Sequence, residues 1–155
     1  MDKHYLTPLF APASIAVLAG RADNPEPLTS YAQALHPALR AQRFAGNLQF
    51  VDTHTSGTLA DLAQRKSDLA IIALPPAEVP AALEVAGRIG CRAALVLSSG
   101  MDADQAANLK KIARREGLYL LGPNSLGFQR PHLQLNASAA GPLASDGPLA
   151  LVCQS

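Results

Sequence analysis

Short polar turns follow the apolar runs of this sequence, and the turns contain residue types that suit a ligand with a phosphate group and an uncharged arm. Arg21 offers a planar guanidinium whose donors match phosphate oxygens. Ser98-Ser99-Gly100 offers two hydroxyls and a backbone N–H. Pro75-Pro76 has no N–H donors, so it provides carbonyl groups and an apolar wall. These residue types indicate ligand binding.

Each of these turns also has a structural interpretation. Arg21 fits a solvated loop, and Ser98-Ser99-Gly100 fits a cap for the next helix. Gly122-Pro123-Asn124-Ser125 either serves a site or reverses the chain. Asp52 is either a ribose-binding carboxylate or a turn residue. Gly20 is the single glycine of the first loop, so the glycine pattern of a dinucleotide site is missing and NAD binding is only an alternative.

No spacing in the sequence predicts a catalytic group or a metal site. The four histidines stand apart from one another, and we expect structural or solvent roles for His4, His36, His54 and His132. The two cysteines, Cys91 and Cys153, are far apart, which argues against a disulfide framework and against zinc. We therefore predict no catalytic residue and no metal ligand.

Five apolar runs predict the strands that position the turns: residues 14–18, 47–51, 68–74, 93–97 and 118–121. Helical spacing between the runs predicts helices near 28–39, 59–64, 76–89 and before 117. This alternation predicts an α/β fold, a Rossmann-like, doubly wound and mostly parallel sheet with helices on both faces. The carboxyl ends of parallel strands meet at one edge, where such folds bind ligands.

Three segments have individual expectations. Pro37 lies inside a helical pattern, where proline costs about 3 kcal/mol, so we expect a kink or two short helices. Residues 128–140 lack a helical pattern and predict an irregular stretch or a short hairpin. Residues 149–152 resemble another buried strand with little chain after it, so we expect a longer parent protein.

Length and composition limit the possible classes. The 155 residues, 48% of them apolar, predict one domain. A net charge of +1 gives no field that favours nucleic acid or a membrane surface. No apolar stretch reaches about 20 residues and the start of the chain lacks a signal-peptide pattern, so we expect a cytoplasmic protein.

Several motifs follow one another along the chain: LFAPASIAVL (9–18), RFAG (43–46), DLAIIALPP (68–76), VP (79–80), SSG (98–100), GPNSLG (122–127) and LNAS (135–138). In this order they resemble the N-terminal CoA-binding domain of NDP-forming acyl-CoA synthetases. The same domain occurs in the succinyl-CoA synthetase alpha subunit and in protein lysine acetyltransferases that fuse this region to a GNAT domain.

The resemblance implies that CoA or acetyl-CoA lies along the strand ends, with its nucleotide near the first two strands and its pantetheine toward the third and fourth. It divides the chain into a CoA-binding domain (1–148) and the start of a succinyl-CoA ligase-like domain (149–155). This segment would then bind rather than catalyse. The expected cofactor-binding residues are Gly20, Arg21, Ala22, Val51, His54, Leu74, Pro75, Pro76, Ser98, Ser99, Gly100 and Asn124.

Two departures from the family pattern concern the nucleotide end. Relatives have more glycine after the first strand, where this chain has Ala19-Gly20-Arg21-Ala22-Asp23. Relatives end the second strand with Val-Asn-Pro-Lys, whose lysine contacts phosphate, where this chain has Val51-Asp52-Thr53-His54. The departures favour a regulatory domain of a protein acetyltransferase over an active synthetase. The alternative is a scaffold that has lost CoA and packs against sister domains or forms a homo-oligomer.

Overall fold

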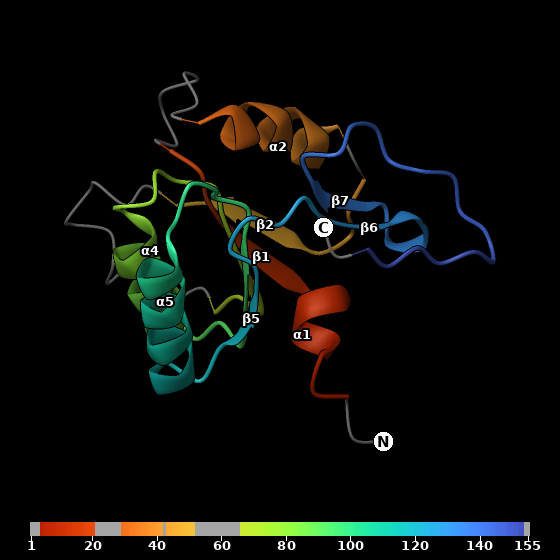
Figure 1. Cartoon of the computed structure of the whole chain (residues 1–155). Helices are drawn as coiled ribbons and strands as arrows, with labels where there is room; N and C mark the ends of the chain where they lie inside the picture. The colour runs from red at the N-terminus through yellow and green to blue at the C-terminus, as the bar shows by residue number, and fades with distance from the viewer. Residues whose placement is uncertain (1–3, 21–28, 42, 52–65, 154–155) are drawn as a thin grey trace.

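The computed structural model describes residues 4–20, 29–41, 43–51 and 66–153, and its centre is a five-stranded sheet (Figure 1). All strands are parallel, and their order is β2-β1-β3-β4-β5. This confirms the predicted Rossmann-like sheet, whereas the helix expected at 59–64 lies outside the described residues. The strands are β1 (Ser14–Leu18), β2 (Asn47–Phe50), β3 (Leu69–Ile72), β4 (Ala93–Val96) and β5 (Tyr119–Leu121).

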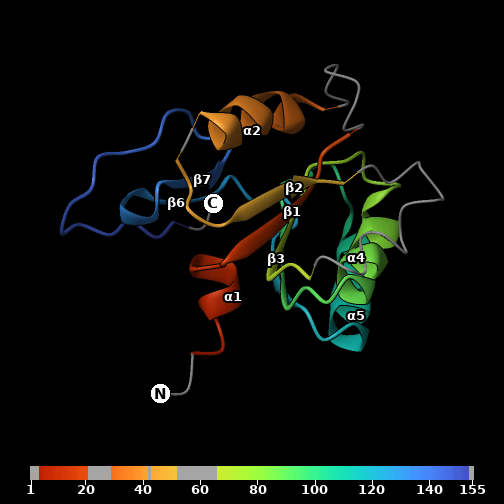
Figure 2. The same cartoon turned by 180° about the vertical axis from the view of Figure 1, so that it is seen from behind.

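Helices cover both faces of the sheet, as predicted. The helices α4 (Val79–Arg88) and α5 (Ala103–Arg115) pack together on one face. The opposite face is covered by α1 (Thr7–Phe10) and α2 (Ser30–Arg40), which are prominent in Figure 2. Each helix joins two parallel strands or leads into one, which is the arrangement that right-handed crossovers produce.

An antiparallel hairpin completes the second face. It consists of β6 (Gly127–Arg130), the 3-10 turn η1 (Pro131–Leu133) and β7 (Leu135–Ser138). The strand β7 is buried throughout and packs against α2. Residues 128–140 therefore form the hairpin that the sequence left as one of two possibilities.

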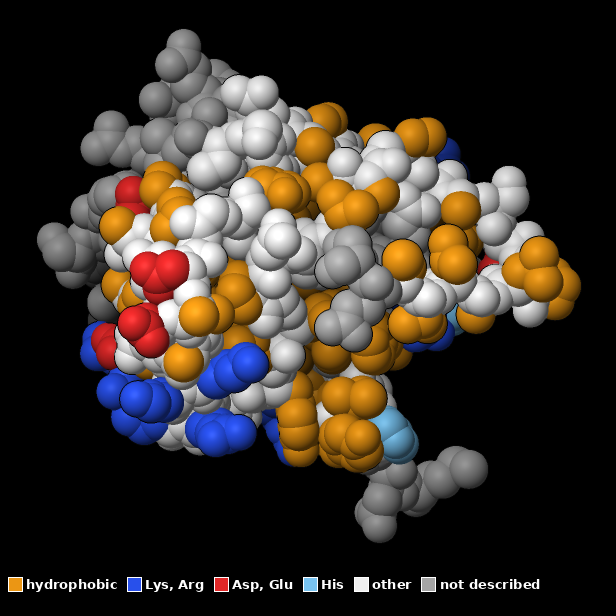
Figure 3. Space-filling view, in the orientation of Figure 1, with side chains coloured by type: hydrophobic (Ala, Val, Ile, Leu, Met, Phe, Trp, Pro, Cys, Tyr) orange, Lys and Arg blue, Asp and Glu red, His pale blue; other side chains and the backbone are white. Residues whose placement is uncertain are grey.

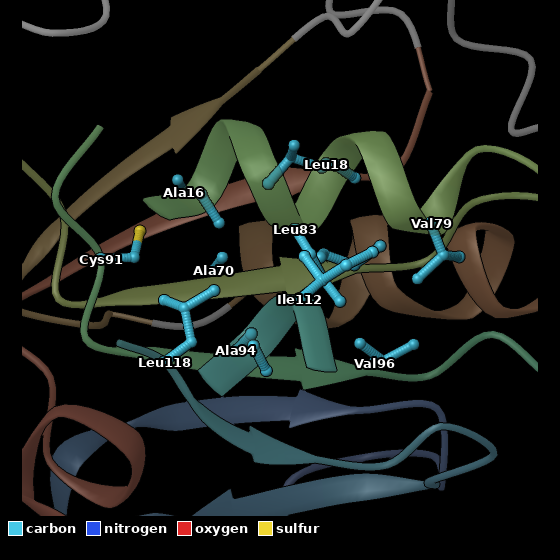
Figure 4. Packing of buried hydrophobic residues seen from close by; sticks show 14 of the residues in the cluster. Ala16, Leu18, Ala70, Val79, Leu83, Cys91, Ala94, Val96, Ile112 and Leu118 are labelled. Carbon is cyan, nitrogen blue, oxygen red and sulfur yellow. The ribbon is translucent and has the colours of Figure 1, made fainter. Parts of the chain in front are cut away.

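The central strands are buried on both sides, which explains why they read as uninterrupted apolar runs. In β1, Ala16 and Leu18 face the core beneath α4 and α5, and Ile15 and Val17 face the core beneath α2. Figure 4 shows the first core, in which Leu83 of α4 and Ile112 of α5 meet above the strands.

Pro37 does not divide the helix that contains it. One helix, α2, runs from Ser30 to Arg40 through Pro37, and the Ala41 N–H donates to the Pro37 carbonyl. The expectation of two short helices is wrong because Leu35 and Leu39, on either side of the proline, are buried in the second core. This packing outweighs the backbone hydrogen bond that proline removes.

Residues 149–152 do not form the strand that their composition suggested. Leu149 and Leu151 are 95% and 93% exposed and have no regular secondary structure, because no described strand pairs with them. The division of the chain at residue 149 stays a prediction.

Gly122 ends β5 in a conformation that only glycine adopts easily. Its φ is +97°, and a Cβ there would collide with the carbonyl oxygen of Val96 in β4. We expect Gly122→Ala to lower the free energy of unfolding by about 3–5 kcal/mol, from left-handed strain and overpacking combined. The control Gly117→Ala also has positive φ but open space around the new methyl group, so it should cost about 1–2 kcal/mol. Urea unfolding measures both, and equal losses would contradict the collision.

Cys91 is 4% exposed in the core beneath α4 and α5. Its thiol should make the free energy of unfolding depend on pH in the alkaline range. Burial raises the pKa of this thiol from 9.0 to about 12, and the Asp68 carboxylate adds to the rise. Above pH 9 the unfolded thiol ionises while the folded one does not. The free energy of unfolding should therefore fall by about 1.4 kcal/mol per pH unit in this range. Cys91→Ala should remove this part of the slope in urea unfolding between pH 9 and 11. Cys153→Ala, at an exposed thiol, should keep it, and parallel profiles for wild type and Cys91→Ala would refute the linkage.

Candidate functional site

The described part of the predicted site lies at one edge of the sheet, at the carboxyl ends of the five parallel strands. Arg21, Ala22 and His54 lie outside the described residues, so their positions stay predictions. The nine described residues follow β1 (Gly20), β2 (Val51), β3 (Leu74, Pro75, Pro76), β4 (Ser98, Ser99, Gly100) and β5 (Asn124).

The strand order places a reversal of chain direction at this edge. From β1 the chain goes to β2 on one side, and β3, β4 and β5 then extend the sheet on the other side. Because β1 and β3 are neighbours, the connections that leave them diverge, and open α/β sheets bind ligands at such a point. Gly20, with φ of +108°, turns the chain away from β1 here. Leu74 and Pro75 follow the end of the neighbouring strand β3.

The hydroxyl of Ser98 holds two strand ends together. Its Oγ donates to the Leu74 carbonyl at 2.6 Å and accepts from the Leu74 N–H at 3.1 Å. Ser98 is 3% exposed. The hydroxyl therefore satisfies backbone groups just beyond β3, and a contact between Ser98 and a ligand stays a prediction.

Ser99 and Gly100 fit the ligand interpretation better than the capping one. The N-cap of α5 is Asp102, whose carboxylate accepts from the Gln105 N–H at 2.7 Å while the Gln105 side chain accepts from the Asp102 N–H. Ser99 is half-buried and Gly100 is exposed with φ of +83°. Both residues thus line the edge without capping the helix.

The turn after β5 is tied to the turn after β4. The Asn124 N–H donates to the Ser98 carbonyl at 2.9 Å, and Asn124 has a left-handed φ of 57°. Gly122-Pro123-Asn124-Ser125 therefore reverses the chain, as one interpretation proposed. Asn124 is exposed in this turn, just beyond the carboxyl end of β5, and its role in binding a ligand stays a prediction.

Pro75 and Pro76 form a half-buried apolar wall after β3 and lead into α4. The Pro75 carbonyl accepts from the Glu78 N–H at 2.9 Å, which closes the turn before the helix. No backbone N–H is available at either proline. The wall suits an uncharged ligand segment.

Two residues that the sequence analysis did not assign to the site position its turns. Thr29 is the N-cap of α2, and its hydroxyl accepts from the Ala32 N–H and donates to the carbonyl of Ala73, next to Leu74. The His36 Nε2 lies 3.2 Å from the carbonyl of Ala19, next to Gly20. A threonine before an apolar helical pattern is a capping signal. The hydrogen bond from the Thr29 hydroxyl to the Ala73 carbonyl, however, has no signal in the sequence.

Neither a metal centre nor a membrane segment is seen in the described ranges. Within them, no three His, Cys, Asp or Glu side chains gather closely enough to hold an ion. None of the described helices combines the length and apolar character needed to cross a bilayer.

Comparison with known families and curated proteins gives consistent results. Residues 46–131 match the family described as the CoA binding domain. The ADP-forming acetate–CoA ligase of Methanocaldococcus jannaschii is 33% identical over 92 residues, which cover 57% of this chain and 13% of that protein. The alpha subunit of ADP-forming acetate–CoA ligase I from Pyrococcus furiosus is 35% identical over 95 residues, covering 57% of this chain and 20% of the subunit. The chain thus spans a fifth or less of the length of these relatives.

Solved structures share the fold. The apo form of dinucleotide-forming acetyl-coenzyme A synthetase 1 from Ca. Korarchaeum cryptofilum aligns with a TM-score of 0.75 at 24% identity, over 88% of this chain and 31% of that one. A crystal structure from Pyrococcus horikoshii OT3 aligns with a TM-score of 0.76 at 25% identity, over 92% and 34% of the two chains.

The two serines at the edge should respond differently to truncation. Ser98→Ala leaves the Leu74 N–H and carbonyl without their buried partner, so it should lower the free energy of unfolding by about 1–3 kcal/mol. Ser99→Ala, whose hydroxyl has no hydrogen bond among the described residues, should change it by less than about 0.5 kcal/mol. Chemical denaturation distinguishes them, and a neutral Ser98→Ala would refute the structural role.

Proposed function

Because the chain belongs to the CoA-binding domain family, we propose that it binds CoA or acetyl-CoA at the carboxyl edge of its sheet. One observation supports this location of the site more strongly than the other observations do. All nine described residues assigned to the site from the sequence lie at the ends of the strands, around the point where the β1 and β3 connections diverge.

The chemistry of the edge suits the parts of CoA differently. The half-buried wall of Pro75 and Pro76 is apolar and lacks donors, which fits the uncharged pantetheine arm. Gly100, exposed and without a side chain, allows a ligand to approach the backbone. We assign the phosphates to the first two strand ends, where Arg21 supplies a guanidinium and His54 replaces the lysine of the family pattern.

In this proposal the segment binds and does not catalyse. Among the described residues of the site, no nucleophile has an adjacent base, so in this proposal the catalytic groups come from other domains of a longer acyl-CoA synthetase or protein acetyltransferase. The names of the curated relatives support the synthetase branch over the acetyltransferase branch. Sister domains of such a parent would then be the partners of this domain.

The test is a calorimetric titration of the chain with CoA, acetyl-CoA, dephospho-CoA and NADH. We expect CoA and acetyl-CoA to bind, dephospho-CoA to bind more weakly, and NADH not to bind, because the first loop has only one glycine. Absence of heat and of any thermal shift with millimolar CoA would refute the proposal and favour a scaffold that has lost the ligand.

Two variants probe the phosphate end in the same titration. Arg21→Ala should weaken CoA about tenfold, since it removes a charge-assisted contact. His54→Lys should tighten CoA about threefold, and this gain should disappear with dephospho-CoA and at high salt. Arg114→Ala, at an exposed arginine near the end of α5, is the matched control and should leave the affinity unchanged. A loss equal to that of Arg21→Ala in this control would mean that only overall charge matters.

A further inference from the structure

A cavity lies at the opposite end of the sheet from the proposed CoA site. Figure 1 shows α1 beside the start of β1 at this end. The volume of the cavity is about 160 Å³. Because the CoA edge is at the other end of the same strands, this cavity is separate from the proposed CoA site. It is lined by His4, Tyr5, Thr7, Pro8, Ala11, Ala13, Asp68 and Arg92.

Two residues of opposite charge line this cavity. Asp68 and Arg92 precede β3 and β4, and the Arg92 N–H donates to the Asp68 carbonyl at 3.0 Å. Their side chains form no ion pair with each other in the described structure. The Asp68 Oδ2 accepts from the Ala13 N–H at 2.7 Å, which fixes the carboxylate and leaves Oδ1 without a partner among the described residues.

Arg92 differs from Arg115, an arginine whose charge is already compensated. Arg115 donates to Glu84 at 2.7 Å and to Glu116 at 2.9 Å. The exposed guanidinium of Arg92 has no such carboxylate partner within the described ranges. Figure 3 shows basic side chains gathered over the lower end of α5, with acidic ones above them. Arg92 is therefore available to a ligand in the cavity.

An aromatic wall borders the charged pair. The Tyr5 ring lies 5.5 Å from the Tyr119 ring and 4.4 Å from the His4 ring. Pro8 adds apolar surface. The cavity thus combines a cation, an anion and an apolar wall. A cavity of about 150 Å³ holds a molecule as large as benzene, so the available space suits a ligand of about six to eight non-hydrogen atoms.

We propose that this cavity binds a small zwitterion of the α-amino-acid class. The ligand carboxylate binds the Arg92 guanidinium, the ammonium binds Oδ1 of Asp68, and the side chain lies against Tyr5 and Pro8. A simple anion would meet the Asp68 carboxylate, and a simple cation would meet Arg92. Only a ligand with both charges satisfies both groups.

The test compares L-alanine with two smaller analogues, each of which lacks one charged group, on the 155-residue chain by NMR titration. L-alanine has both charges, propionate lacks the ammonium group, and ethylamine lacks the carboxylate. We expect L-alanine to bind in the millimolar range and to shift the ring signals of Tyr5 and His4, since ligands of this size bind weakly. Propionate and ethylamine should bind at least about tenfold more weakly, because each leaves one charge unpaired.

Three variants locate the binding. Arg92→Gln and Asp68→Asn should each weaken L-alanine at least about tenfold, while the asparagine keeps an oxygen for the Ala13 N–H. Arg88→Gln, at an exposed arginine of α4 that does not line the cavity, is the control and should leave binding unchanged. CoA affinity should be the same in all three, which separates this inference from the proposed function.

Each contrary result overturns the inference. Propionate binding as tightly as L-alanine would make the cavity an anion site, and equal binding of ethylamine would make it a cation site. No ring shift with L-alanine at its solubility limit would show that the cavity takes no zwitterion. Arg88→Gln weakening L-alanine as much as Arg92→Gln would show that only the general charge of this surface matters.

Discussion

Burial of β1, β3 and β4 on both faces is the constraint on which the rest of this structure depends. Each apolar side chain of these strands enters one of two cores, so residues such as Ile15, Leu69 and Val96 leave no room for a polar group between the strand ends. Polar chemistry is therefore restricted to the places where strands begin and end. The molecule has two such edges, and the two proposed sites occupy one each.

Backbone groups just beyond a buried strand need partners, and the carboxyl edge supplies them from side chains. The Ser98 hydroxyl binds both backbone groups of Leu74, and the Thr29 hydroxyl binds the carbonyl of Ala73. These bonds join β4 and α2 to the end of β3. The edge is thereby organised before any ligand arrives, which reduces the entropy lost on binding.

The sheet follows from the sequence because a continuous apolar run of strand length is typical of a strand buried on both faces, as β1, β3 and β4 are. Individual roles at the edge were harder to predict. Ser98 has the composition of a ligand-binding turn, and only its burial shows that its hydroxyl is used internally. Pro37 breaks helices locally, but Leu35 and Leu39 keep α2 whole through contacts with distant residues. Tertiary packing of this kind leaves no local pattern. The cavity near Asp68 depends on chain segments that are far apart in sequence, so spacing does not reveal it.

The hairpin that covers the second face has a consequence for the order in which the chain becomes protected. Ala32 and Leu35 of α2 are made early during translation, but Leu135 and Ala137 of β7, which share their core, are made much later. Until β7 leaves the ribosome, the nascent chain exposes the apolar side of α2 to water. Such an interval of exposure is when a chaperone binds or when unfinished chains associate. Completing this face with a strand that is made late therefore affects the chain during biosynthesis rather than in the finished fold.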